Sequence, residues 1–182
     1  EMCYRDWSSD VCSSDLAQTM TMEWLGIGVS PSAYDDGVKS QTDRPDFFGD
    51  ARMRQALAYC LDRQKVVDTV LFGLSQAPDS YLPSDHPLHN GNLQTYAFNP
   101  EAGKDLLDAI GWLDSDNDPT TSRLAFGVTG VPARTPLVFD YYTTTATQRH
   151  QVTEIFAQSL AACGIGLNTV FYDAPNFYAQ GP

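Results

Sequence analysis

The sequence contains no apolar run of about 20 residues, the length a membrane-spanning helix needs, so it predicts no membrane span. It is also poor in basic residues, with 11 Lys and Arg against 23 Asp and Glu and a net charge of −12. A surface this acidic repels phosphate backbones and anionic lipid, which argues against nucleic acid or an anionic membrane as a partner. The balance is compatible with a secreted or periplasmic protein.

Signatures of common enzyme sites are missing as well. The sequence has no Gly-x-Ser-x-Gly elbow, HExxH motif, Walker-type phosphate loop or GxGxxG motif. His86 and His89 lie near each other beside Asp85, but Pro87 interrupts the helix that such a zinc pair would need. Both are therefore predicted to be loop histidines in solvent. The absence of these motifs does not exclude catalysis, but it leaves no residues from which to argue it, and we predict no enzyme activity, no cofactor and no metal.

The start of the chain stands apart from the rest. Residues 5–16, RDWSSDVCSSDL, resemble a translated short-read sequencing adapter and back-translate into one codon by codon. The alternative is a genuine Ser/Asp-rich tail, and nothing in the segment has the pattern of a signal peptide. We interpret residues 1–16 as foreign to the natural protein. Residues 17–182 are long enough for one domain with a core.

Two consecutive helices are predicted from Asp50 onward. Asp50 and Asp62 stand where a side-chain oxygen caps the first turn of a helix, and Gly73 stands where the second helix ends. Apolar residues recur at helical spacing in both segments. The expected buried positions are Met53, Ala56, Leu57, Cys60 and Leu61 in the first helix, and Val66, Val67, Val70 and Leu71 in the second.

The remaining elements follow from turn residues and periodicity. A strand is expected over residues 20–29, then a polar loop over 31–45, and an irregular proline-containing segment after Gly73. A short helix should run between Asn99 and Trp112, followed by an Asp-rich structural turn over 114–123. The last part predicts strands at 123–128 and 136–142, a helix at 148–163 and a strand at 165–172, with a parallel pairing across that helix.

Two cysteines, Cys60 and Cys163, lie outside the first 16 residues. Two helices that share a sheet could bring them together, and an exported protein would permit their oxidation. Both also lie on apolar helix faces, where a free thiol packs as a small hydrophobe. We expect two separate buried thiols, with a bridge as the alternative, because sequence alone does not give the distance between them.

A stretch around the helix pair carries a family resemblance. GDARMRQALAYCLDRQKVVDTVLFG, residues 49–73, resembles a segment of family 5 extracytoplasmic solute-binding proteins, the oligopeptide and dipeptide receptors of ABC importers. A second stretch, NPEAGKDLLDAIGW at 99–112, resembles the family's DPEKAKALLAEAGW at the right distance. The matching residues of the first stretch are Asp50, Arg52, Arg54, Gln55, Ala56, Leu57, Asp62, Arg63 and Gly73.

The resemblance implies an α/β fold, part of the second lobe of a two-lobed type II periplasmic-binding-protein-like fold with a mixed sheet flanked by helices. Residues 17–182 would then be a partial lobe, truncated at both ends. The implied function is the substrate-binding component of an ABC importer, which captures oligo- or dipeptides and delivers them to a membrane permease. It also implies a monomer at the periplasmic or extracellular face of the membrane, with its export signal missing here.

Four residues are expected at the ligand by that resemblance. Ser30 follows a strand that in the family ends in a polar residue near the ligand, and Trp24 on the same strand is either a pocket wall or a core residue. Ser80 and Tyr81 lie in a loop similar to one near the family's interlobe cleft, where a tyrosine can pack and hydrogen-bond at once. The alternative for Tyr81 is packing under its own loop.

Other functions stay open at this level. A stand-alone enzyme or a regulatory ligand-binding domain could use the same α/β core, and a purely structural role is a third option. Family members also bind nickel chelates, sugars or opines, so the resemblance does not identify the ligand.

Overall fold

The computed structural model describes residues 3–6, 9–12, 25–27, 45–84, 86–118 and 120–180. The chain divides into two compact units. The first unit comprises Glu1–Leu25 and Pro78–Leu93, and the second comprises Gly26–Ala77 and Gln94–Pro182. All of the described helices belong to the second unit.

The first unit contains one pair of short strands, β1 (Cys3–Asp6) and β2 (Ser9–Cys12). They are antiparallel, with Cys3 opposite Cys12 in the register. Both lie within residues 1–16, the segment interpreted as foreign to the natural protein. The other part of the first unit, residues 78–93, forms neither helix nor strand at the positions described, as expected from its prolines. Of the strand predicted over residues 20–29, only 25–27 are described, and these three are not in a strand. The loop predicted over 31–45 lies outside the described residues except for Pro45.

The predicted helix pair is confirmed as α1 (Ala51–Cys60) and α2 (Arg63–Thr69). The Asp50 carboxylate caps α1 by accepting a hydrogen bond from the Arg52 N–H at 2.8 Å. Asp62 caps α2 in the same way, through the Lys65 N–H at 2.9 Å. The prediction that Gly73 directly ends α2 is wrong, because the helix stops at Thr69. The Gly73 N–H instead closes the following turn on the Val67 carbonyl at 2.9 Å.

The third helix, α3 (Pro100–Ile110), also has the predicted ends. The Asn99 side chain accepts from the Ala102 N–H at 3.2 Å, and Pro100 occupies the first turn, where its missing N–H costs nothing. Gly111 ends the helix with φ 109°. A Cβ there would collide with the Phe126 carbonyl, so both backbone conformation and space call for glycine.

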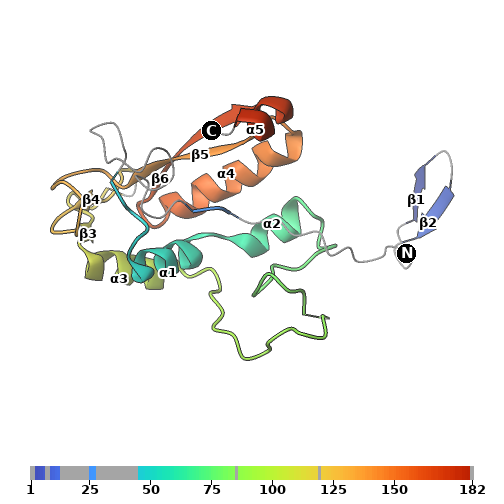
Figure 1. Ribbon diagram of the computed structural model, residues 1–182, viewed down its shortest axis with the longest axis horizontal. Helices are drawn as coiled ribbons and strands as arrows, with labels where there is room; N and C mark the ends of the chain where they lie inside the picture. The colour runs from blue at the N-terminus through green and yellow to red at the C-terminus, as the bar shows by residue number, and fades with distance from the viewer. Residues whose placement is uncertain are drawn as a thin grey trace. The chain divides into compact units, whose positions relative to one another are not determined.

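The C-terminal part forms the predicted parallel unit. β5 (Val138–Thr144) leads into α4 (Thr147–Ala161) and then β6 (Gly166–Tyr172), and the two strands pair parallel from Val138–Gly166 to Thr144–Tyr172. Figure 1 shows α4 running along this pair. The chain then enters α5 (Ala174–Gln180).

The antiparallel sheet of the second unit is smaller than predicted. β3 (Trp112–Leu113) pairs antiparallel with β4 (Leu124–Ala125), so the strand predicted over 123–128 is only two residues long. An isolated bridge from Leu124 to Pro136 continues this sheet toward β5. In the described residues the expected mixed sheet is thus present as separate parallel and antiparallel pairs.

The core of the second unit lies between the helices and these strands. α1 and α3 lie side by side, and α2 contacts α4 around Val70, Val152 and Ile155 (Figure 1). The Trp112 ring is fully buried and meets Phe47 edge-to-face with centroids 5.3 Å apart. None of the helices in the described part has the length and apolar character needed to cross a membrane.

A disulfide joins Cys60 at the end of α1 to Cys163 just after α4. The expectation of two separate thiols is therefore wrong. The two Cα atoms are 6.1 Å apart and both side chains are fully buried. Gly103 of α3 faces the bridge, and a Cβ at this position would overlap Cys60 Sγ and lie 3.2 Å from Cys163 Sγ. The absence of a side chain at Gly103 makes the room in which the sulfurs meet.

Arg123 is the main polar group of the core, with 6% of its surface exposed. Its guanidinium donates to the Cys163 carbonyl at 2.9 Å, to the Trp112 carbonyl at 2.8 Å and to the Asp108 carboxylate. The first two acceptors belong to residues that follow the ends of α4 and α3. One side chain thus binds the segments after two helices and holds them beside β4.

Replacing both bridge cysteines, as Cys60→Ala with Cys163→Ala, should lower the free energy of unfolding by about 2–5 kcal/mol, because the bridge closes a long loop. The residues it joins are 103 positions apart. Urea denaturation followed by tryptophan fluorescence measures the loss. Reductant should destabilise the parent chain and leave the double variant unchanged. A double variant as stable as the oxidised parent would contradict a structural role for the bridge.

Gly103→Ala provides a second test of the same contact. In the parent chain the new methyl overlaps a sulfur atom, and we expect a loss of about 1–3 kcal/mol. In the background without the two cysteines the overlap is gone, and alanine should stabilise α3 by up to about 1 kcal/mol because it is the better helix former. The same urea denaturation should thus give opposite signs in the two backgrounds. Equal effects would refute this packing.

Arg123→Met should lower the free energy of unfolding by about 2–4 kcal/mol, because two buried carbonyl groups lose their donor. Asp108→Asn serves as the matched control. The Asp108 side chain is 52% exposed, so removing its charge should cost less than about 1 kcal/mol. Urea denaturation of both variants gives the comparison. Similar losses in the two would mean that the exposed ion pair, and not carbonyl capping, is what Arg123 contributes.

Candidate functional site

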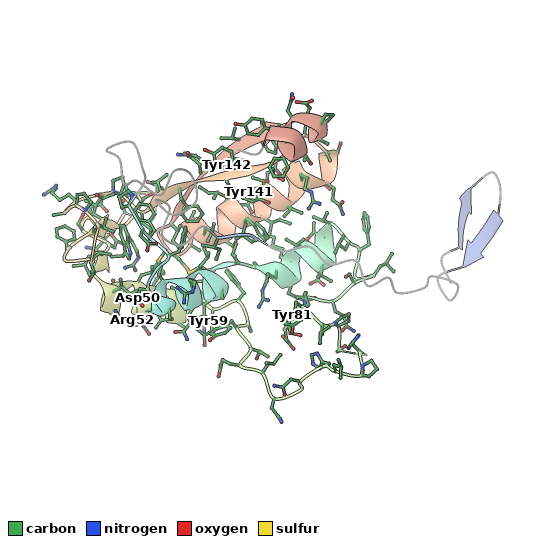
Figure 2. All side chains as sticks on the ribbon, viewed as in Figure 1. Asp50, Arg52, Tyr59, Tyr81, Tyr141 and Tyr142 are labelled. Atoms are coloured by element: carbon green, nitrogen blue, oxygen red, sulfur yellow. A yellow bond between two sulfur atoms is a disulfide. The ribbon has the colours of Figure 1, made fainter. Side chains whose placement is uncertain are left out.

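Two of the four predicted ligand residues can be placed. Trp24 and Ser30 lie outside the described residues. Ser80 is half-buried, and its hydroxyl is engaged within its own loop, donating to the Leu82 carbonyl at 2.8 Å and accepting from the Leu82 N–H at 3.1 Å. Tyr81 exposes 82% of its surface and is labelled in Figure 2. In this unit its ring is accessible, and Ser80 organises the turn that carries it.

The loop histidines hold the same segment together. The Leu88 N–H donates to His86 Nδ1 at 3.1 Å, and His89 Nδ1 lies 3.1 Å from the Leu82 carbonyl. Across the described residues, no three His, Cys, Asp or Glu side chains gather as a metal site would require. Both histidines are half-buried in local hydrogen bonds, which differs from the solvent-exposed state that the sequence predicts.

Asp50 and Arg52 of the family motif form an ion pair at the start of α1. Arg52 Nη2 lies 2.6 Å from Asp50 Oδ2, and Arg52 Nη1 donates to the Ala109 carbonyl of α3 at 3.3 Å. Hydrogen bonds from the Arg52 side chain, and then from its N–H, lower the pKa of Asp50. The same pairing raises the pKa of Arg52. Figure 2 shows both residues at this end of the helix, where they join α1 to α3.

The other basic residues of the motif hold segments outside the helices. Arg54 donates to the carbonyls of Phe48 at 2.6 Å and Gly49 at 2.9 Å, which fixes the chain entering α1. Arg63 donates to the Tyr96 carbonyl at 2.6 Å. These roles are positional, and residue spacing alone did not predict them.

A shallow, solvent-open hollow lies between α1, α3 and the segment that precedes α3. Tyr59 and Tyr96 form its aromatic part, with ring centroids 5.2 Å apart and planes at 76°. The Gln55 side-chain amide donates to the Tyr96 hydroxyl at 3.2 Å and holds that ring in place. The sequence analysis missed this hollow. Its lining residues are Gln55, Tyr59, Gln94, Tyr96, Ala102, Asp105 and Leu106.

The Asp-rich segment after β3 is a turn, as predicted. Asp114 accepts from the Asn117 N–H at 2.8 Å, and Asp118 accepts from the Thr120 N–H at 2.8 Å. A hydrogen bond from the Asp118 N–H, and then one from Thr121, lower the pKa of Asp116, while bonds from Thr120 lower that of Asp118. The carboxylates are used within the turn itself, in the manner of Asx turns.

A second group of aromatic residues lies on the parallel strand pair. Tyr142 and Tyr172 have ring centroids 6.1 Å apart, and Asn168 of β6 donates to the Asp140 carboxylate of β5 at 3.2 Å. Burial, followed by the nearby Asp140 charge, raises the pKa of Tyr142. Figure 2 labels Tyr141 and Tyr142 on this strand. These contacts join the two strands across one face of the sheet.

The chain is similar to a known protein family and to several of its members. The family model described as bacterial extracellular solute-binding proteins, family 5 (middle) matches residues 17–181. Heme-binding protein A of Haemophilus influenzae is 31% identical over 105 residues, 54% of this chain and 18% of that protein. The oligopeptide-binding protein AppA of Bacillus subtilis is 30% identical over 79 residues, 42% of this chain and 14% of that protein.

The fold is likewise similar to a solved structure. The oligopeptide-binding protein from Thermus thermophilus, crystallised with a pentapeptide, superposes with a TM-score of 0.60 at 24% identity. The match covers 70% of this chain and 20% of that chain. The α/β arrangement is thus that of part of one lobe of a type II periplasmic binding protein, as predicted. These matched regions span a fifth or less of the relatives' length.

The family match covers nearly the whole chain and includes both predicted motifs, whose residues make the helix caps and interhelical contacts described above. The chain therefore belongs to the bacterial extracellular solute-binding proteins of family 5.

Proposed function

We propose that this chain is part of the solute-binding receptor of an ABC importer, a binding protein and not an enzyme. Family membership across residues 17–181 is the observation that carries the proposal. In such a receptor, two lobes close over a solute by a hinge motion, and ligand binding shifts the population toward the closed state. The closed form then delivers the solute to a membrane permease. The receptor acts as a monomer and has no nucleic-acid partner.

Short peptides are the proposed solute. The AppA relative is named as an oligopeptide-binding protein, and the Thermus structure was determined with a pentapeptide. The Haemophilus relative, named for heme, provides the main competing ligand class. Peptides suit a receptor with an accessible tyrosine such as Tyr81, because every peptide offers amide groups to hydrogen-bond and side chains to pack on the ring. Ser80, Trp24 and Ser30 are proposed as further ligand residues.

The receptor is proposed to work outside the cytoplasm, in the periplasm or at the outer face of the cell membrane. The disulfide between Cys60 and Cys163 supports this, because such bridges form and persist in oxidising compartments. Its sulfur atoms are buried and contribute to the core, which is typical of a structural bridge.

We further propose that residues 17–182 are part of a longer protein and that residues 1–16 do not belong to it. The family match begins at residue 17, directly after the adapter-like segment, which supports that boundary. Sequencing the source locus across both ends tests the proposal. A genomic reading frame that encodes residues 1–16 in place would overturn the boundary.

The ligand class can be tested by calorimetry on the complete protein that contains this chain. We expect a pool of tri- to pentapeptides to bind with micromolar or tighter affinity, and hemin to bind at least about tenfold more weakly. The isolated chain should bind neither well, because its matched region covers only a fifth or less of the three relatives named above. Tight hemin binding without peptide binding would mean that heme, and not a peptide, is the solute. Micromolar peptide binding by the isolated chain would contradict the need for a second lobe.

Tyr81→Ala in the complete protein tests the loop's part in binding. Loss of the aromatic contact should weaken peptide binding about 3- to 10-fold. Leu88→Ala, an exposed apolar residue of the same loop, is the matched control and should leave the affinity within about twofold. Calorimetric titration with one peptide measures both. Equal effects of the two variants would remove Tyr81 from the ligand site.

A further inference from the structure

One acidic residue, Asp105 of α3, borders the hollow between α1 and α3. Among the described residues, Asp105 makes no ion pair and no side-chain hydrogen bond, whereas its neighbours on the same helix are paired. Glu101 holds Lys104 at 3.0 Å, and Asp108 holds the buried Arg123. Asp105 is the carboxylate of α3 that stays available, and it borders the hollow.

Two glutamine side chains that line the hollow use their NH₂ groups in hydrogen bonds within the protein. Gln55 uses its NH₂ group on the Tyr96 hydroxyl at 3.2 Å, and Gln94 uses its NH₂ group on the Thr95 carbonyl at 3.2 Å. Each amide therefore keeps its side-chain oxygen for another donor. With Asp105, the hollow offers more acceptors than donors around two tyrosine rings. That combination is suited to a cation with several N–H groups.

In the described part of the chain, the basic side chains nearest to the hollow already have partners. The lining contains neither lysine nor arginine. The Arg63 guanidinium, from the start of α2, donates to the backbone carbonyl of Tyr96, and Lys104 is paired with Glu101. The hollow is thus negatively charged and aromatic, on a chain whose net charge is −12.

We propose that this hollow is a docking point for a protein partner and that it receives one lysine or arginine side chain of that partner. The cation would lie against the Tyr59 and Tyr96 rings while its N–H groups reach Asp105 and the glutamine oxygens. The hollow is open and shallow, a shape that accepts a side chain from a facing surface. The acidic charge of the chain steers a basic surface toward it.

This docking point goes beyond solute capture. It is built from α1, α3 and the segment before α3, with Tyr59 on α1 as labelled in Figure 2, and it uses none of the four residues proposed at the solute. The proposed transport function can therefore fail while the docking point stands, and the reverse also holds.

The test is an NMR titration of the ¹⁵N-labelled full chain with an acetylated, amidated hexapeptide of alternating glycine and lysine. We expect signals of the Gln55 and Gln94 side-chain amides and of the Asp105 backbone to shift. Asp105→Asn should weaken binding about fivefold to tenfold, because the cation loses its charged acceptor. Asp105→Glu keeps the charge and should retain affinity within about twofold.

Asp68→Asn is the matched control, because it removes the same charge from an exposed carboxylate of α2 outside the hollow. It should change the affinity by less than about twofold. Equal losses for Asp68→Asn and Asp105→Asn would indicate diffuse attraction and overturn the proposal. Shifts confined to other residues or the absence of binding would also overturn it. So would equal binding of a control hexapeptide in which glutamate replaces each lysine. Concentration-dependent shifts of the same signals without peptide would assign the hollow to a second copy of this chain, which also overturns it.

Discussion

The Cys60–Cys163 bridge is the constraint on which the second unit depends. It fastens the end of α1 to the residue just after α4, and it does so beneath α3, whose Gly103 leaves room for the two sulfur atoms. Three helices that are separate in sequence are thereby held at one place. A covalent bond between residues 103 positions apart removes much of the freedom of the unfolded chain, so α1 and α3 can pack on a fixed base.

Arg123 complements the bridge from the polar side. Its guanidinium donates to the carbonyl of Cys163, itself a member of the bridge, and to that of Trp112 just after α3. Sulfur and guanidinium together hold the ends of α1, α3 and α4. The motif residues add further contacts between these elements. Asp50 and Arg52 join α1 to α3, and Arg63 binds the Tyr96 carbonyl in the segment before α3.

The family motif is therefore largely structural in this chain. Its charged residues cap helices and bind backbone carbonyls, and none of those contacts requires a solute. What the motif builds is a rigid α1–α3 surface with a tyrosine-lined hollow, while the residues proposed for solute binding include Ser80 and Tyr81 of a loop in the other unit. The motif and these proposed ligand residues thus lie in different stretches of the sequence.

The sequence by itself determined helices α1 to α4, the N-terminal caps of the first three, the parallel β5–β6 pair and the family, because each rests on local periodicity, on a capping residue or on a contiguous motif. Only the tertiary structure decided the disulfide, the role of Arg123, the short β4 and the hollow. Their contacts join residues far apart in the chain: 103 positions in the bridge, 40 from Arg123 to Cys163, and 41 from Gln55 to Tyr96. No local pattern encodes such a contact, since it depends on how the elements pack and not on the period of any one of them.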